Sequence, residues 1–323
     1  MDPLDLLRLN LTSPIVLGFA LGLVAALVKG DLRLPDAVHS VLASYLLLAI
    51  GLKGGSELAK VSPTEIALPA LATLAAGVTV PIACFFVLRR LGKLSVVDSA
   101  AIAAHYGSVS IVTFTAATTF VESRALTFEG HLAALVAFLE VPGILVALIL
   151  ARSARASIPW RQGLHEVFAS KSNLLLVGGI VIGAVAEPSA FASVKPFFVD
   201  PFRGALTLFM IDMGLLAAAR LRDLRQMGGF LVGFALVAPV VNGFFGALLG
   251  SAAGLSVGGA TIFATMVASA SYIAAPVAVR ISLPEASPAL YLTSALGITF
   301  PFNLAVGIPL YHEFALMLAA RAT

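Results

Sequence analysis

Serine, threonine and glycine gather in two apolar stretches of this sequence, where hydroxyls and freed backbone groups could bind a ligand. The first stretch reads His105-Tyr-Gly-Ser-Val-Ser110 and is followed by Thr113, and the second reads Ala268-Ser-Ala-Ser-Tyr-Ile-Ala-Ala-Pro276. Glycine and proline weaken a helical hydrogen-bond ladder, and serine and threonine cap a helix that restarts. Both stretches therefore predict a helix that is interrupted and then resumes.

A restarted helix leaves N–H groups unpaired and points the positive end of its dipole outward. Two such ends would form an anion site without an arginine, and nearby hydroxyls and carbonyls could hold Na⁺. The alternative is packing, since small residues are common between membrane helices. Because both stretches carry Ser-x-Ser at matching positions, we favour binding for them. The pairs Gly18/Gly22 and Gly179/Gly183 are predicted to serve packing.

The composition shows which kind of protein must position these stretches. The chain has 323 residues, of which 59% are hydrophobic and 11% charged, and its mean hydropathy is +1.02. Soluble domains carry about 25% charged residues, so a soluble enzyme or a nucleic-acid binder is excluded. The single cysteine, Cys84, excludes an internal disulfide framework. We predict a polytopic, all-α membrane protein.

A transmembrane helix needs roughly 20 apolar residues. On that basis we expect ten spans, with the last long enough to continue as an interfacial helix. They lie near residues 12–29, 36–53, 64–88, 96–121, 130–152, 172–187, 199–219, 227–252, 256–280 and 287–319. Of the twenty Lys and Arg residues, thirteen fall on the odd-numbered loops. The positive-inside rule then places those loops in the cytoplasm and both termini outside.

The two halves of the chain repeat one another at a nearly constant shift of 161 residues. Gly18-x-x-x-Gly22 recurs at Gly179, Leu94-Ser-Val96 recurs at Leu255, and Ser108-Val-Ser110 falls on Ser269-Ala-Ser271. Five spans per copy is an odd number, so the second copy must enter the membrane from the opposite side. The sequence predicts two inverted five-helix repeats, residues 1–153 and 172–323, joined by a cytoplasmic linker at 154–171.

Ionisable residues inside membrane spans are candidates for function. Asp98 is interpreted mainly as a helix N-terminal acid, whereas His105 could line the substrate, handle protons or simply pack. Glu140 and Asp212 could each bind a cation, carry a proton or pair with a neighbouring helix. Asn242 and Asn303 are expected to donate hydrogen bonds between helices rather than to bind a ligand. Zinc spacings, nucleotide loops and nucleophile elbows are absent from the sequence, so we do not expect an enzyme.

Several further motifs follow one another along nearly the whole chain. They are Ser13-Pro14, Ile50-Gly-Leu-x-Gly-Gly55, Val97-Asp98, Gly107-x-Val-Ser110-x-x-Thr113, Val141-Pro142, Phe202-Arg-Gly204, Ala238-Pro-x-Val-x-Gly243, Ala268-Ser-x-Ser-x-Ile273-x-x-Pro276, Arg280-x-x-x-Pro284-x-Ala-x-Pro288-x-x-Tyr291 and Ile308-Pro309. In order and spacing the chain resembles the sodium-dependent bicarbonate symporters of cyanobacteria and other bacteria. That resemblance implies ten helices in two inverted repeats, a homotrimer, and an elevator-like movement of a core domain.

The resemblance also implies that bicarbonate lies between two broken helices, with Na⁺ alongside. Carried over by position, the substrate-binding residues are Gly107, Ser108, Ser110, Thr113, Ser269, Ser271, Tyr272, Ala274 and Pro276, with Na⁺ near Ser110, Thr113, Ser269 and Ser271. The chain departs from the family where Tyr272 replaces an Asp, Ala274 a Ser, Ile111 a Gly and Glu140 an Asp. An acid near the seventh-span glycine is displaced to Asp212. The short linker leaves regulation by a PII-like partner open.

We therefore predict a secondary-active symporter of a small anion, with bicarbonate as the leading candidate and Na⁺ as the coupling ion. No other cofactor and no nucleic acid are expected. One alternative is a proton-coupled carrier of another small carboxylate that uses His105, Glu140 or Asp212. A passive anion channel is a further alternative.

Overall fold

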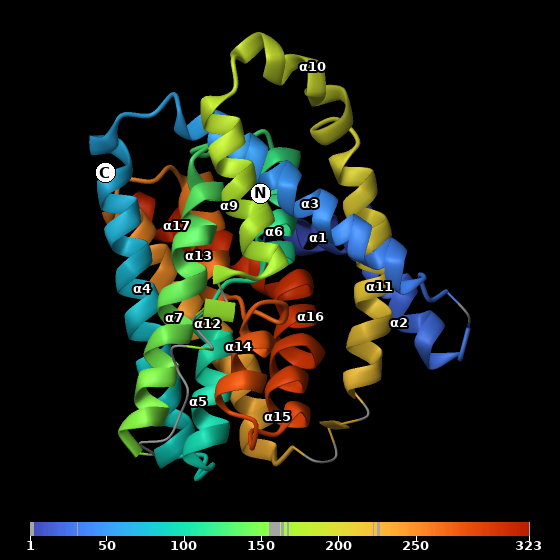
Figure 1. Cartoon of the computed structure of the whole chain (residues 1–323), viewed down its shortest axis with the longest axis vertical. Helices are drawn as coiled ribbons and strands as arrows, with labels where there is room; N and C mark the ends of the chain where they lie inside the picture. The colour runs from blue at the N-terminus through green and yellow to red at the C-terminus, as the bar shows by residue number, and fades with distance from the viewer. Residues whose placement is uncertain are drawn as a thin grey trace.

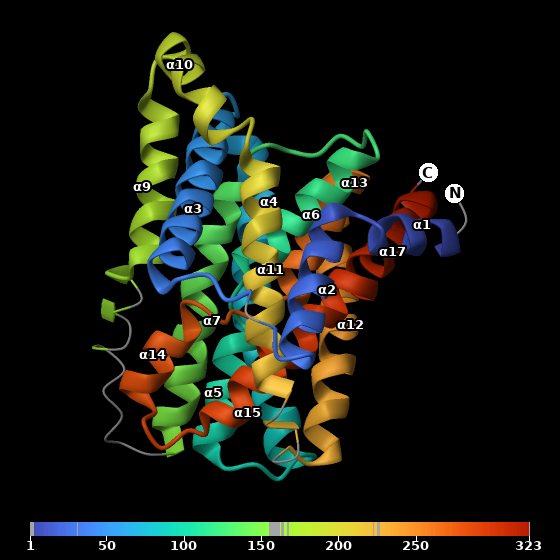
Figure 2. The same ribbon diagram turned by 90° about the vertical axis from the view of Figure 1, so that its right-hand side faces the viewer.

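Helix is the only regular secondary structure in the part of the chain that the structure describes. A computed structural model covers residues 3–30, 32–154, 162, 165, 166, 168–221, 223, 224 and 227–322. Most of the predicted linker at 154–171 lies outside these residues. Long helices run side by side along the longest axis, with α10 at one end of the molecule and α5 and α15 at the other (Figures 1 and 2).

The helices of the first half are α1 (Pro3–Leu11), α2 (Pro14–Leu27), α3 (Asp36–Leu58), α4 (Pro63–Arg90), α5 (Val96–Tyr106), α6 (Ile111–Ser123) and α7 (Leu132–Ala154). Those of the second half are α9 (Lys171–Val185), α10 (Pro188–Phe198), α11 (Phe202–Leu221), α12 (Gly229–Ala252), α13 (Val257–Ala268), α14 (Ala275–Ser282) and α15 (Pro288–Leu292). A last helical run continues through η2 (Thr293–Thr299), α16 (Phe300–Phe302), η3 (Asn303–Gly307) and α17 (Ile308–Ala322), in which η2 and η3 are π-helical.

Serine caps fix where several of these helices begin. The side chains of Ser13, Ser95, Ser110, Ser170 and Ser256 each accept a hydrogen bond from the backbone N–H three residues further on. Such a cap satisfies one of the donors that a helix start leaves unpaired. Ser95 and Ser256 stand 161 residues apart, so the two halves start α5 and α13 in the same way.

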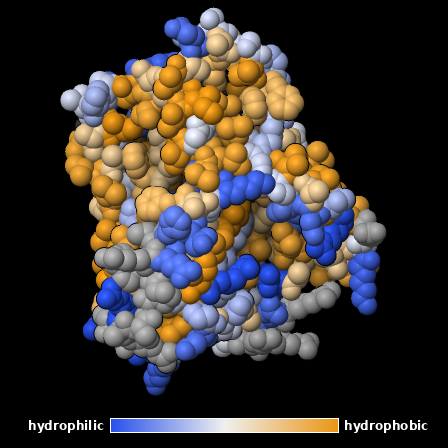
Figure 3. Space-filling model, viewed as in Figure 1, coloured by the Kyte–Doolittle hydropathy of each residue, from blue (hydrophilic) through white to orange (hydrophobic). Residues whose placement is uncertain are grey.

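Apolar length identifies the chain as a multi-pass membrane protein. Among the residues that the structure describes, seven helical segments are long and apolar enough to cross a bilayer, when α5 and α6 are taken together through their interruption. Three other apolar helices, α2, α9 and α13, have 14, 15 and 12 residues. At 1.5 Å per residue each spans less than a hydrocarbon core of about 30 Å. The predicted total of ten spans stays a prediction. Apolar side chains dominate the upper half of the face in Figure 3, as expected for a lipid-facing surface.

One packing group consists of α2, α3, α9 and α11, and it is built on glycine contacts. On α2, a Cβ atom added to Gly22 would overlap the Ile211 carbonyl of α11. On α9, a Cβ added to Gly183 would overlap the Leu52 carbonyl of α3. These close approaches confirm that the two predicted Gly-x-x-x-Gly pairs serve helix packing. The first helix of each predicted repeat thus lies against the second helix of the other.

The remaining long helices form a second packing group, which contains α4, α5, α6, α7, α12, α13 and α17. Within it α4 packs on α5 and α7, and α12 packs correspondingly on α13 and α17. The two groups meet where α3 contacts α7 and where α11 contacts η2. The interrupted helices therefore belong to the second group.

Three features of the fold differ from the sequence prediction. Two short helices, α1 and α10, lie outside the predicted spans because each is too short to give a membrane-length apolar window. In Figure 2, α1 lies across the long helices rather than along them. The last span contains two π-helical stretches that the sequence did not indicate. It continues without a break into α17, as expected, and the interfacial position of its end stays a prediction.

Candidate functional site

The first interruption separates α5 from α6 at the predicted position. Helix α5 ends at Tyr106, α6 begins at Ile111, and the residues between them are buried. The Ser110 hydroxyl caps α6 by accepting from the backbone N–H of Thr113 at 3.2 Å and from the Thr113 hydroxyl at 2.9 Å. The first turn of α6 therefore starts inside the protein, and its leading N–H groups have no carbonyl one turn earlier in that helix.

The second interruption separates α13 from α14, again at the predicted position. Helix α13 ends at Ala268 and α14 begins at Ala275. Ser269 turns its hydroxyl back to the Met266 carbonyl at 2.8 Å, and Ser271 accepts from the Ala275 N–H at 3.3 Å. Pro276 stands in the first turn of α14, where a missing N–H has no effect on the helix.

Two hydrogen bonds join the interruptions directly. The Ser110 N–H donates to the Ser269 hydroxyl at 2.9 Å, and the Ser271 N–H donates to the His105 carbonyl at 2.8 Å. The predicted residues Ser110, Thr113, Ser269 and Ser271 therefore come together in one buried cluster. Gly107, Ser108, Tyr272 and Ala274 belong to the same two interrupted segments.

The two interrupted helices run in opposite directions. Near the start of α13, Ser256 donates its N–H to Glu129 at 2.7 Å and its hydroxyl to the Thr127 carbonyl at 3.1 Å, in the loop after α6. Near the start of α5, Asp98 accepts from the Ser287 N–H at 2.9 Å, in the loop after α14. Both α6 and α14 thus begin at the interruptions and run to opposite ends of the molecule. Their N-terminal dipole ends meet at the cluster.

Several buried polar atoms at the interruptions lack a hydrogen-bond partner within the described part of the chain. They are the Ser108 hydroxyl, His105 Nε2 and the Tyr272 hydroxyl. His105 donates from Nδ1 to the Ala101 carbonyl at 2.7 Å, so the neutral ring presents Nε2 as an acceptor. Because buried polar groups are normally satisfied, this cluster has free capacity for a polar ligand.

Glu140 lies on α7, near the first interruption but not joined to it by a hydrogen bond. It is 1% exposed, and its Oε2 has no hydrogen-bond partner among the described residues. Three residues later, Gly143 packs so closely on Gly107 that an added Cβ would overlap the Gly107 carbonyl. A buried ionised carboxylate is costly unless a cation or a proton neutralises it. Glu140 therefore stays a candidate for cation or proton coupling.

Asp212 is separate from this cluster and has a partner of its own. On α11 it accepts a hydrogen bond of 2.5 Å from Nδ1 of His39 on α3. This pairing supports the structural alternative for Asp212 over a role as a free cation ligand. We did not single out His39 in the sequence, and its separation of 173 residues from Asp212 leaves no local signal for the contact.

Two other sequence interpretations can be compared with the structure. Asp98 lies in the first turn of α5, where it accepts from the Ser95 hydroxyl at 2.7 Å, as the helix-terminal interpretation predicted. Asn303 in η3 donates to the Ala268 carbonyl at 3.1 Å, which confirms its role between helices. That bond satisfies a carbonyl at the end of α13, beside the second interruption.

The fold and the site define a class, namely membrane proteins in which two oppositely directed, interrupted helices meet at a buried polar cluster, as in many secondary transporters. Residues 14–316 match the profile of the Na⁺-dependent bicarbonate transporter superfamily, and the chain belongs to that family. No curated protein matches the sequence. Among the described residues no three His, Cys, Asp or Glu side chains form a metal-binding group.

Proposed function

We propose that this protein is a secondary-active symporter that carries bicarbonate together with Na⁺. The observation that supports it most is the direct hydrogen bonding between the two interruptions, because it brings two helix N-termini to one buried point. A small planar anion matches that arrangement. Its charge is stabilised by the dipole ends of α6 and α14, and its oxygens accept from N–H and hydroxyl donors.

The substrate would be held by groups that the protein leaves unpaired. The Ser108 hydroxyl can donate to one anion oxygen, and so can the hydroxyl of Tyr272. His105 Nε2 can accept from a protonated oxygen, which bicarbonate has and nitrate lacks. This combination of donors with one acceptor favours a hydrogen-bearing anion.

Na⁺ would be a co-transported substrate that binds beside the anion. The hydroxyl oxygens of Ser110, Thr113, Ser269 and Ser271 are candidate ligands, together with carbonyls freed at the ends of α5 and α13. The buried carboxylate of Glu140 is a further candidate for coupling to the cation. Cation and anion in adjacent positions neutralise one another. Each therefore lowers the cost of burying the other, and this gives a physical basis for coupled binding.

Movement would occur between the two packing groups. We propose that the group carrying both interruptions (α4, α5, α6, α7, α12, α13 and α17) moves as a unit against α2, α3, α9 and α11, in an elevator-like cycle. The glycine contacts between α3 and α9 and between α2 and α11 support this division, because they make the group of α2, α3, α9 and α11 tightly packed. We also propose a homotrimeric assembly, a bacterial inner-membrane location, external termini and the two inverted repeats that the sequence predicts.

A second candidate is proton-coupled carriage of a small carboxylate. The buried and unpartnered carboxyl of Glu140 favours it, because protonation would remove the cost of its charge. Asp212 no longer supports this candidate, since it is paired with His39.

Uptake of ¹⁴C-bicarbonate into proteoliposomes would test the proposal. We expect accumulation with an inward Na⁺ gradient and none with an equal K⁺ gradient, at a fixed pH on both sides. Accumulation driven instead by a pH gradient, without Na⁺, would favour the proton-coupled alternative. Uptake that needs no gradient and does not saturate would indicate a channel.

A further inference from the structure

A cavity of about 400 Å³ opens beside α6, at the end of the molecule that carries α10. Its walls come from both packing groups, α6 and α7 on one side and α3 and α11 on the other. From α6 it is lined by Phe114, Thr115, Thr118, Thr119 and Glu122. The cavity therefore follows one face of α6 from its outer end inward.

The inner end of the cavity reaches almost to the first interruption. Phe114 lines it and donates its backbone N–H to the Ser110 carbonyl at 2.9 Å, so the two residues lie one helical turn apart. One turn of α-helix is about 5.4 Å long. Above Phe114, the threonine side chains give the wall a polar lining. Their hydroxyls donate to α6 carbonyls, which leaves the hydroxyl oxygens able to accept from a passing water or protonated anion.

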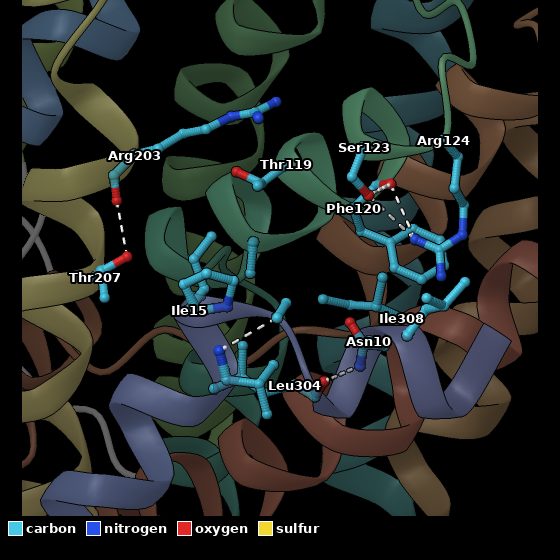
Figure 4. Close-up of a pocket in the computed structure, with 15 residues that line it drawn as sticks. Asn10, Ile15, Thr119, Phe120, Ser123, Arg124, Arg203, Thr207, Leu304 and Ile308 are labelled. Atoms are coloured by element: carbon cyan, nitrogen blue, oxygen red, sulfur yellow. Dashed lines mark hydrogen bonds between the residues drawn. The ribbon is translucent and has the colours of Figure 1, made fainter. Parts of the chain in front are cut away.

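Three charged side chains join the two packing groups at the outer end of this cavity. Glu122 of α6 accepts from Lys53 of α3 at 3.0 Å and from Arg203 of α11 at 2.8 Å. We call these three residues the Glu122 bridge. Figure 4 shows Arg203 extending from α11 toward Thr119 on α6, and Thr119 and Arg203 also line a smaller neighbouring cavity of about 180 Å³.

We infer that this cavity is the access route by which a small anion reaches the interrupted helices, and that the Glu122 bridge is its charged gate. The inference rests on the proposed function for its ligand class. Lys53 and Arg203 place two cations at the cavity, and Glu122 and Asp200, which also line it, balance their charge while the bridge is closed. Glu122 also links the moving α6 to α3 and α11, so the bridge must open when the two groups move apart.

Thiol labelling tests the route without measuring transport. The chain has one cysteine, Cys84, which is 4% exposed, so Cys84→Ala gives a clean background. In it, full-length Thr118→Cys is exposed to a membrane-impermeant anionic methanethiosulfonate, on intact cells and on inside-out vesicles. We expect labelling from the outside only, and protection by bicarbonate with Na⁺. The matched control is Val279→Cys, 161 residues later on α14 and 0% exposed, which should stay unlabelled.

The gate is tested by comparing two labelling rates of Thr118→Cys, one with the anionic methanethiosulfonate and one with a neutral methanethiosulfonate. The quantity measured is the ratio of the first rate to the second. Glu122→Gln leaves two unpaired cations and should raise that ratio about tenfold, whereas Lys53→Met should lower it, as expected for a charged cleft that concentrates anions. No labelling at Thr118→Cys, or labelling only from the inside, overturns the route. An unchanged ratio in Glu122→Gln overturns the gate. Labelling as expected without Na⁺-driven bicarbonate uptake would refute the proposed function and leave the route intact.

Discussion

The backbone N–H of Ser110 donates to the hydroxyl of Ser269 at 2.9 Å, although the two residues lie 159 positions apart. In the other direction, the Ser271 N–H donates to the His105 carbonyl. Each interruption thus completes the hydrogen bonding of the other. A substitution at one interruption should therefore change the hydrogen bonding of both. Single substitutions can thus test the role of the cluster.

Ser110→Ala and Ser271→Ala should each weaken apparent bicarbonate affinity. Each substitution removes a hydroxyl that caps a helix beside the proposed site, and one such hydrogen bond is worth about 1 kcal/mol, or several-fold in affinity. The measurement is the KM for bicarbonate in proteoliposomes at saturating Na⁺. Ser95→Ala is the control, because Ser95 caps α5 away from the interruption. It should lower stability by about 1 kcal/mol and leave KM unchanged. Equal changes in KM for all three variants would mean that the site lies elsewhere.

Glu140→Gln should remove coupling while preserving the fold. The amide keeps the size of the side chain but can neither bind a cation by charge nor release a proton. Because the wild-type carboxyl has an unpartnered oxygen in a buried position, the neutral variant should be at least as stable in thermal denaturation. Bicarbonate exchange across the membrane should continue, whereas accumulation against a gradient should be lost. Retained Na⁺-driven accumulation would exclude Glu140 as a coupling residue.

Asp212→Leu should have the opposite phenotype. Its carboxylate is hydrogen-bonded to His39 between α11 and α3, and loss of such a bond in a buried position costs about 1–3 kcal/mol. We expect a lower melting temperature in detergent and an unchanged Na⁺ dependence of uptake. If Na⁺ dependence disappears while stability stays the same, Asp212 belongs to the ion pathway and its structural interpretation fails.

Gly183→Ala should disrupt the contact between α9 and α3. The new methyl group would overlap the Leu52 carbonyl, and overpacking of this kind costs about 1–3 kcal/mol. Gly178→Ala, on the same helix, is the matched control, since no atom lies within 4 Å of its added Cβ. It should be neutral or stabilising, by up to about 1 kcal/mol, because alanine favours helix more than glycine does. Thermal melting of both purified variants checks the difference.

The interruptions could be predicted from the sequence because their causes are local. Ser110 and Ser271 provide caps, Gly107 marks the end of α5, Pro276 suits the first turn of α14, and the repeated Ser-x-Ser marks both places. The partners across the fold could not be predicted in this way. His39 lies 173 residues from Asp212, and Lys53 and Arg203 approach Glu122 from helices far apart in sequence. Only the packing of α3, α6 and α11 brings those charges together.

The π-helical stretches of the last helical run could not be predicted from the sequence either. Its apolar residues predicted a membrane span, but no residue pattern indicated the π-helical stretches η2 and η3. Each π turn shifts the backbone bonding register, and such bulges depend on tertiary partners. One partner is Asn10 of α1, which donates to the Leu304 carbonyl at 2.6 Å. The short helix α1, which our spans did not include, thus helps to set the geometry of the last run.

The glycine contacts between α3 and α9 restrict how this sequence can change over evolutionary time. At Gly51, Gly55 and Gly183 the opposing backbone occupies the space that any side chain would need. A lineage can exchange leucine for valine on the lipid-facing side at little cost. Substitution of one of these glycines would instead require the backbone of the facing helix to shift at the same time. We therefore expect this line of contact to be among the slowest-diverging surfaces in related proteins.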